Sequence, residues 1–134
     1  MSHIIIYIHC VWATRKRAPV LDVQSRTMLF AHMHFVARQK KILLDTIGGY
    51  DDHVHCLIRL CAMQRVADIV KQLKGESARW ANENNLLGVP LCWGIGYYAA
   101  SVSVTSANAV RLYIQKQQEH HRQPGFTEDY LRRL

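Results

Sequence analysis

Two histidines separated by one residue, in Asp52-His53-Val54-His55, are a candidate metal-binding pair in this chain. Alternate side chains of an extended strand point to the same face, so both imidazoles would lie together and Val54 would point away. Neutral imidazoles are common ligands of divalent cations. Two ligands make an incomplete site, so a further ligand must come from elsewhere in the chain. A pair of surface or packed histidines without a metal is the open alternative.

A tyrosine and a glutamine four residues apart, Tyr113 and Gln117, would share one face of a helix. If that helix lay against the strand face with His53 and His55, the Gln117 amide oxygen would complete the metal shell. The Tyr113 hydroxyl would then be a nucleophile beside the metal. The alternative is that Tyr113 is a half-buried core aromatic and that Gln117 is solvated.

The segments that must position these side chains have apolar residues that repeat with the period of a strand in some segments and of a helix in others. The pattern predicts a strand over 3–14, a helix capped by Asp22 and running to 41, and strands over 42–47 and 53–61 joined by a Gly48-Gly49 turn. A second helix is predicted over 65–84 and a fourth strand from 90–93 and 97–104. A third helix begins at Ser106 or Asn108, runs through Gln117 and stops at Pro124-Gly125, before a short final turn over 129–134.

This order predicts an α+β, ferredoxin-like (split βαβ) fold over residues 1–134 as a single domain. Its four-stranded antiparallel sheet would have helices on one face and an appended C-terminal helix that carries Tyr113. No repeat or linker divides the chain.

Composition bounds the class of protein. The 134 residues are 49% hydrophobic, which excludes general disorder and allows an ordinary core. The longest apolar run is too short to span a membrane, no basic leader precedes it, and the four cysteines form no CxxC pair, so we expect a cytoplasmic protein with reduced thiols.

The positive charge is concentrated at the start of the chain. The formal net charge is +7, and residues 1–41 contain seven basic residues against one acidic residue. Such a segment favours a polyanionic partner, of which nucleic acid is the commonest, and a solvated basic surface is the alternative. Arg15, Lys16 and Arg17 are the best candidates for binding DNA, with Trp12 or Tyr98 as platforms on which unpaired bases stack.

Five short motifs follow one another along the chain, and their order and spacing are informative. They are His9 to Arg17, Asp52 to Ile58, the LKGES stretch Leu73 to Ser77, Trp93 to Val102, and Tyr113 to Gln117 followed by Glu119-His120-His121. Together they resemble the HUH-type single-tyrosine transposases of small bacterial insertion sequences, the IS200-like type, and the related REP-associated tyrosine transposases.

The resemblance implies a DNA transposase that cleaves and rejoins single-stranded DNA through a 5'-phosphotyrosine intermediate in the bacterial cytoplasm. His53, His55 and Gln117 would hold a divalent metal, Mg²⁺ or Mn²⁺, and Tyr113 would be the nucleophile. The DNA would carry hairpin ends, with Lys74 of the LKGES stretch added to its binding residues. The family also forms homodimers in which the tyrosine helix of one subunit completes the site of the other. This chain departs from many relatives in having Asp51 where they have proline, and in ending at Leu134.

Two other classes of protein, and one variant of the same class, fit parts of the pattern. A non-catalytic, ferredoxin-like module that binds single-stranded nucleic acid would explain the charge and the aromatic residues, but not the histidine and tyrosine spacings. A small metal-binding regulatory protein would explain only the histidines. A domesticated relative that nicks palindromic repeats would keep the same chemistry. The remaining histidines are expected outside the metal shell: His3, His9, His32, His34, His120 and His121.

Overall fold

The computed structural model describes residues 2–122, 128, 131 and 134. Its centre is a four-stranded sheet made of β1 (Tyr7–Ala13), β2 (Leu43–Gly49), β3 (His53–Arg59) and β4 (Tyr98–Val102). The strands lie in the order β2-β3-β1-β4, and every neighbouring pair is antiparallel. This order is the split βαβ topology that the sequence predicts.

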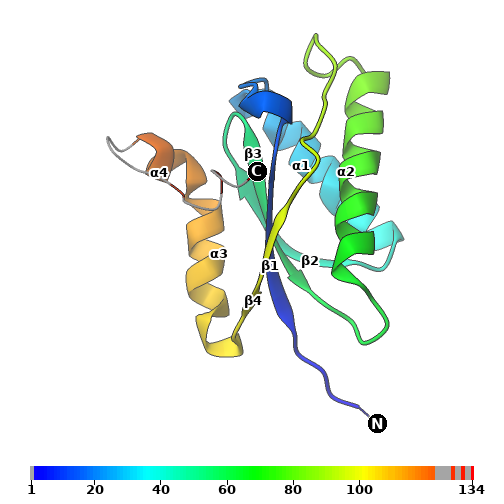
Figure 1. The fold of residues 1–134 in the computed structure, drawn as a ribbon, viewed down its shortest axis with the longest axis vertical. Helices are drawn as coiled ribbons and strands as arrows, with labels where there is room; N and C mark the ends of the chain where they lie inside the picture. The colour runs from blue at the N-terminus through cyan, green and yellow to red at the C-terminus, as the bar shows by residue number, and fades with distance from the viewer. Residues whose placement is uncertain (1, 123–127, 129–130, 132–133) are drawn as a thin grey trace.

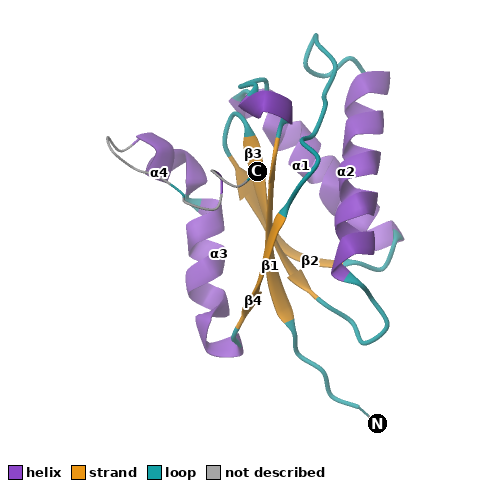
Figure 2. Ribbon diagram, in the orientation of Figure 1, coloured by secondary structure: helices purple, strands orange, loops and turns teal. Residues whose placement is uncertain are grey.

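Helices lie on both sides of the sheet (Figures 1 and 2). Helices α1 (Val23–Gln39) and α2 (Val66–Glu83) pack against each other on one side. On the other side, α3 (Ala107–Gln115) contacts β2 and β3 and is followed by α4 (Gln117–Arg122). Short 3-10 turns, η1 (Arg15–Arg17) and η2 (Val104–Ser106), follow β1 and β4. The structure thus confirms the predicted α+β class, with the tyrosine segment packed on the sheet face opposite the two long helices.

The main core lies between the sheet and the helices α1 and α2. Alternate residues of the central strands contribute to it, including Trp12 from β1 and Val54 from β3, both fully buried. Helix α1 begins where the Asp22 carboxylate accepts a hydrogen bond from the Ser25 backbone N–H, as expected of an N-cap. Because Val54 belongs to this core, its neighbours His53 and His55 face the opposite side of the sheet, toward α3.

Three predicted boundaries are wrong. Strand β1 begins at Tyr7 rather than at residue 3, and β4 is limited to Tyr98–Val102, because the earlier Trp93 makes only an isolated bridge with Thr14. Gly48 and Gly49 are not the hairpin turn: both belong to β2, where they pair with His55 and Val54, and the turn follows them.

The predicted third helix is also divided. The segment leaves α-helical geometry at Lys116, so Gln117 is the first residue of α4 instead of continuing the helix of Tyr113. The predicted stop at Pro124-Gly125 and most of the predicted final turn lie outside the described residues. Among the residues described, no helix combines the length and hydrophobicity that crossing a membrane requires.

Candidate active site

The two histidines of β3 lie side by side on the face covered by α3, and both are fully buried. The strand alternation predicted this common face. Their rings stand edge to face with centroids 5.1 Å apart. His55 sits between Val11 of β1 and Gly48 of β2 in the sheet, so neighbouring strands fix its backbone on both sides.

Each imidazole is held through its Nδ1 atom by a second side chain. An oxygen of the Asp52 carboxylate lies 2.8 Å from Nδ1 of His53, and Nε2 of His9 lies 2.8 Å from Nδ1 of His55. The His9 ring also stacks on His55. Such outer partners fix the tautomer and orientation of histidines that bind metals. His9 was expected outside the metal shell, and the structure shows it as an outer partner that supports His55.

Both Nε2 atoms face oxygen atoms from the C-terminal part of the chain. Nε2 of His53 lies 3.1 Å from Oε1 of Gln117, and Nε2 of His55 lies 3.2 Å from Oε2 of Glu128. Burial lowers the pKa of His55 to about 4, so its ring is neutral at neutral pH and retains a nitrogen lone pair for a metal. These imidazole nitrogens and oxygen donors suit a divalent cation of borderline or hard character.

Tyr113 reaches the same place from α3. Its hydroxyl donates a hydrogen bond to Oε1 of Glu128 at 2.7 Å, and its ring stands edge-on to His55 with the centroids 5.7 Å apart. Gln117 stays near Tyr113 despite the helix break, because its amide nitrogen donates to the Tyr113 carbonyl at 3.3 Å. The four residues selected from sequence spacing, His53, His55, Tyr113 and Gln117, therefore converge within a single chain.

Glu128 lies at the centre of this group and was missed in the sequence. Its side chain is almost completely buried, and its Oε1 lies 3.4 Å from Nε2 of His121. Burial alone would raise the pKa of this carboxyl, but the hydrogen bonds that it accepts from His55 and Tyr113 outweigh burial and hold the pKa below its usual range. No spacing could have identified Glu128, because it lies beyond the last recognisable motif.

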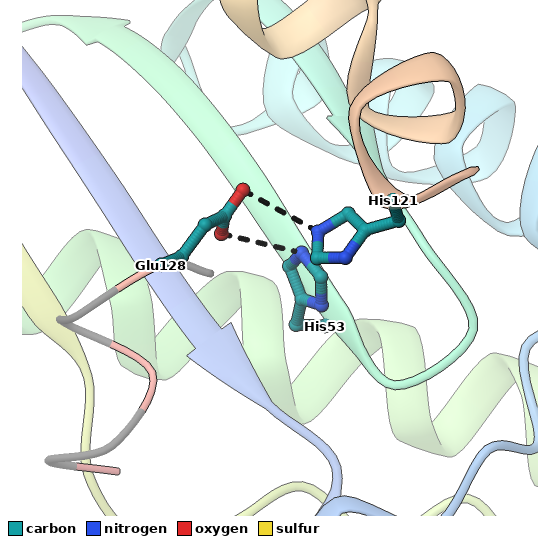
Figure 3. A group of neighbouring side chains, drawn as sticks. All are labelled: His53, His121 and Glu128. Atoms are coloured by element: carbon teal, nitrogen blue, oxygen red, sulfur yellow. Dashed lines mark ion pairs between the residues drawn. The ribbon is translucent and has the colours of Figure 1, made fainter. Parts of the chain in front are cut away.

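Figure 3 shows a second possible set of metal ligands that shares one histidine with the predicted set. His53, His121 and Glu128 offer donor atoms that all lie within 4.8 Å of one another. His121 was expected outside the metal shell, and its ring instead lies 4.9 Å from that of His53. His53 is thus common to both sets.

The predicted DNA-binding cations fall into two groups. Arg15, Lys16 and Arg17 are exposed on η1, and Nε of Arg17 donates to the Asp52 carboxylate at 3.0 Å, so this turn is linked to His53 through Asp52. The ammonium group of Lys74 instead donates to the Gly94 carbonyl at 2.6 Å. Lys74 therefore holds the loop before β4. The candidate stacking residue Trp12 is fully buried in the core, whereas Tyr98 is partly exposed.

The chain is similar in sequence and in fold to known transposases. The family model of IS200-like transposases matches residues 2–117. The ISDra2 transposase TnpA of Deinococcus radiodurans is 28% identical over 116 residues, covering 83% of each chain. The structure of a transposase candidate from the same species superposes with a TM-score of 0.70 and 27% identity, covering 87% of this chain and 93% of the other.

A further solved structure shares the fold at low sequence identity. It is the REP-associated tyrosine transposase bound to a REP hairpin, with a TM-score of 0.64 and 15% identity over 95% of this chain and 76% of the other. The same arrangement of sheet and helices thus recurs in a protein whose sequence has diverged extensively.

Proposed function

Because the chain belongs to the IS200-like transposase family, we propose that it cleaves and rejoins single-stranded DNA with Tyr113 as the nucleophile. One observation carries this proposal: the Tyr113 hydroxyl and the Nε2 atoms of His53 and His55 converge on the buried Glu128 carboxylate. The Gln117 amide oxygen lies beside the same Nε2 atom of His53, at 3.1 Å. Neither a nucleic-acid-binding module nor a regulatory metal protein requires a tyrosine hydroxyl at that point.

The chemistry is a transesterification at phosphorus. The Tyr113 oxygen forms a bond to the phosphorus atom, the bond to the 3' oxygen breaks, and the tyrosine proton is released as the leaving oxygen takes up a proton. The products are a 5'-phosphotyrosine and a free 3'-hydroxyl. Since the number of phosphoester bonds is unchanged, a different 3'-hydroxyl can reverse the step and join two strands without ATP.

His53, His55 and Gln117 would hold a divalent cation, Mg²⁺ or Mn²⁺, and His121 and Glu128 are further donors within reach of it. When bound, such a cation polarises the scissile phosphate and neutralises charge on its oxygens. The protein orients the donors through Asp52 and His9, and neutral, buried His55 needs no deprotonation before it binds a metal.

The DNA partner is proposed to be a single strand with hairpin ends. The REP hairpin bound to the related tyrosine transposase supports this choice, as do the exposed cations of η1 beside the candidate metal site. Arg15, Lys16 and Arg17 would contact phosphates, whereas Lys74 would act by holding its loop. A homodimer that exchanges tyrosine helices remains the family expectation, although within the single chain Tyr113 already reaches its own histidines.

A covalent-adduct assay tests the nucleophile. We expect the protein, incubated with Mn²⁺ and labelled single strands from the DNA on either side of its gene, to form an adduct that survives denaturation. Tyr113→Phe should abolish the adduct, whereas Tyr7→Phe, on the far end of β1, should retain it. An adduct that persists in Tyr113→Phe would exclude Tyr113 as the nucleophile.

Metal titration tests the donor set independently of DNA. The double variant His53→Ala, His55→Ala should lose Mn²⁺ binding measured by calorimetry. Glu128→Gln should lower the affinity by about tenfold, because it removes a buried anionic donor. Unchanged affinity in the double variant would refute the proposed metal site. The matched control is His32→Ala, which should bind Mn²⁺ normally. His32 stacks on Trp80, away from the candidate metal site.

A further inference from the structure

A pocket of about 500 Å³ lies where the end of β1 and η1 meet the loop of residues 92–96. The two walls are joined through the backbone: the Arg15 N–H donates to the Cys92 carbonyl, and the Gly94 N–H donates to the Ala13 carbonyl, both at 2.8 Å. This volume lies within the range of pockets that hold small organic groups. Its described lining includes the cations of η1 and Leu134 but neither Tyr113 nor the candidate metal ligands.

The loop wall is held in place from behind. Lys74 donates to the carbonyls of Gly94 and Ile95, at 2.6 and 3.3 Å. The Trp93 indole N–H donates to the Ser77 hydroxyl at 2.9 Å, and the Trp93 ring stands edge to face with buried Trp12. These contacts preorganise the wall, so binding there costs little ordering of the protein.

The opposite wall is cationic and strained. Lys16 and Arg17 both have a positive φ, 56° and 55°. Two successive non-glycine residues in the left-handed region of backbone conformation are uncommon, and such backbone strain is concentrated at functional sites. Arg17 is engaged by Asp52, whereas Arg15 and Lys16 project exposed side chains beside the pocket. The wall therefore favours an anion next to whatever fills the pocket.

The pocket is also connected to the candidate metal site. The Asp52 carboxylate accepts from Arg17 through one oxygen and lies 2.8 Å from the His53 ring through the other. The Thr14 N–H, at the base of η1, donates to the Asp52 carbonyl at 2.9 Å. A strand whose phosphate reached the histidines would therefore have neighbouring nucleotides close to this pocket.

We propose that the pocket holds one unpaired nucleotide of the DNA strand, with its base against the 93–96 loop and its phosphates on Arg15 and Lys16. A base suits a wall that combines an indole, the fully exposed Ile95 side chain and backbone polar groups. A base within a duplex cannot enter such a pocket. The inference rests on the proposed action on single-stranded DNA and assigns a place for one of its nucleotides.

Gly96 allows the pocket to be filled without disturbing the fold. Among the residues that the structure describes, a Cβ at this position would meet only the Leu134 side chain, at 3.8 Å, so Gly96→Leu projects into the pocket. The matched control is Gly75→Leu on α2, at a position that lines a different hollow. A Cβ there meets no atom of the described part of the chain within 4 Å. Ile95→Glu is a second test variant, since a fully exposed side chain has no role in folding.

The experiment measures fluorescence anisotropy of a labelled mixed-sequence single strand of about 20 nucleotides, in EDTA to exclude metal. Gly96→Leu and Ile95→Glu should each weaken binding about tenfold, the contribution of roughly one bound base, while Gly75→Leu binds as wild type. Affinity for a duplex of the same length should be equal in wild type and Gly96→Leu. Strands containing 5-iodouracil should photo-crosslink to the 92–96 loop.

Wild-type affinity in both test variants, or equal losses for single strand and duplex, would overturn the pocket assignment. The outcome is distinguishable from failure of the proposed function, which is judged by the adduct. If the wild type forms no adduct but Gly96→Leu weakens single-strand binding, the pocket assignment is supported and the proposed enzyme activity is refuted. If the wild type forms the adduct but Gly96→Leu binds the single strand as wild type does, the activity is supported and the pocket assignment is refuted.

Discussion

At the scale of single residues, Asp52 connects three parts of the candidate site. Its carboxylate bridges the Arg17 guanidinium and the His53 ring, and its backbone carbonyl accepts from Thr14. Burial would raise the pKa of Asp52, but the hydrogen bonds to His53 and from Arg17 together hold that pKa below its usual value. Asp52 therefore remains ionised and able to orient the imidazole at neutral pH.

Removing that charge should weaken metal binding without removing a ligand. Asp52→Asn is expected to lower Mn²⁺ affinity by about 10- to 100-fold, the usual effect of losing an outer partner of a metal-binding histidine. Calorimetric titration checks this, with Asp68→Asn on the opposite helix layer as the control. If both variants bind Mn²⁺ equally well, Asp52 does not position His53 for a metal.

Sequence spacing identified some residues of the site and could not identify others. His53 and His55 follow a local rule, because alternate residues of a strand share one face. Tyr113 and Gln117 were selected by the helical repeat, but the helix breaks between them, and a hydrogen bond from the Gln117 amide to the Tyr113 carbonyl keeps them together. His9, His121 and Glu128 join them only through contacts between distant segments. A single sequence contains no period that reports such contacts, so these three were missed or placed outside the site.

At the scale of elements, the backbones of β2 and α3 lie so close together at Gly48 that no side chain fits between them. A Cβ on Gly48 would overlap the Ile114 carbonyl oxygen of α3, and a Cβ on Gly49 would overlap the His53 carbonyl oxygen. A glycine pair between two strands normally indicates a hairpin turn, which is why the sequence analysis placed the turn there. The close packing of α3 against the strand is the physical reason that the prediction failed.

Gly48→Ala should therefore displace α3 and the tyrosine that it carries. We expect the free energy of unfolding to fall by about 1–3 kcal/mol, as in overpacked cores, and adduct formation to fall with it. Chemical denaturation of the metal-free protein measures the first effect. Gly75→Ala is the matched control and should raise stability by about 0.5–1 kcal/mol, because it replaces glycine within a helix in open space. Equal stability of Gly48→Ala and wild type would show that α3 is not closely packed on β2.

At the scale of the whole molecule, the excess of basic residues in the first part of the chain is distributed over several surfaces. Arg15 and Lys16 are exposed on η1, whereas Arg26 is buried and donates to the Leu21 carbonyl and the Gln118 amide oxygen. Lys40 lies elsewhere, beside a shallow hollow lined by residues of α2 such as Lys71. The net charge consequently overstates how many basic side chains can contact one strand of DNA at the same time.

The salt dependence of binding separates these cations. For single-stranded DNA, each neutralised phosphate contributes about 0.7 to the slope of log affinity against log salt concentration. The double variant Arg15→Gln, Lys16→Gln should reduce that slope by about 1.4, whereas Lys40→Gln, Lys71→Gln, which loses the same charge, should leave it near the wild-type value. Equal slopes in both variants would indicate a diffuse electrostatic attraction with no preferred surface.

The glycine at position 48 also bears on how related sequences can be compared. A tyrosine helix can pack on its own β2 in this way only if the strand lacks a side chain at that point, since any Cβ meets the helix backbone. Among aligned homologues, a glycine in this column should accompany a tyrosine helix that packs backbone to backbone on β2, whichever subunit supplies the helix. A larger residue there should accompany a helix that lies farther from the strand, so one alignment column reports how closely the tyrosine approaches the histidines.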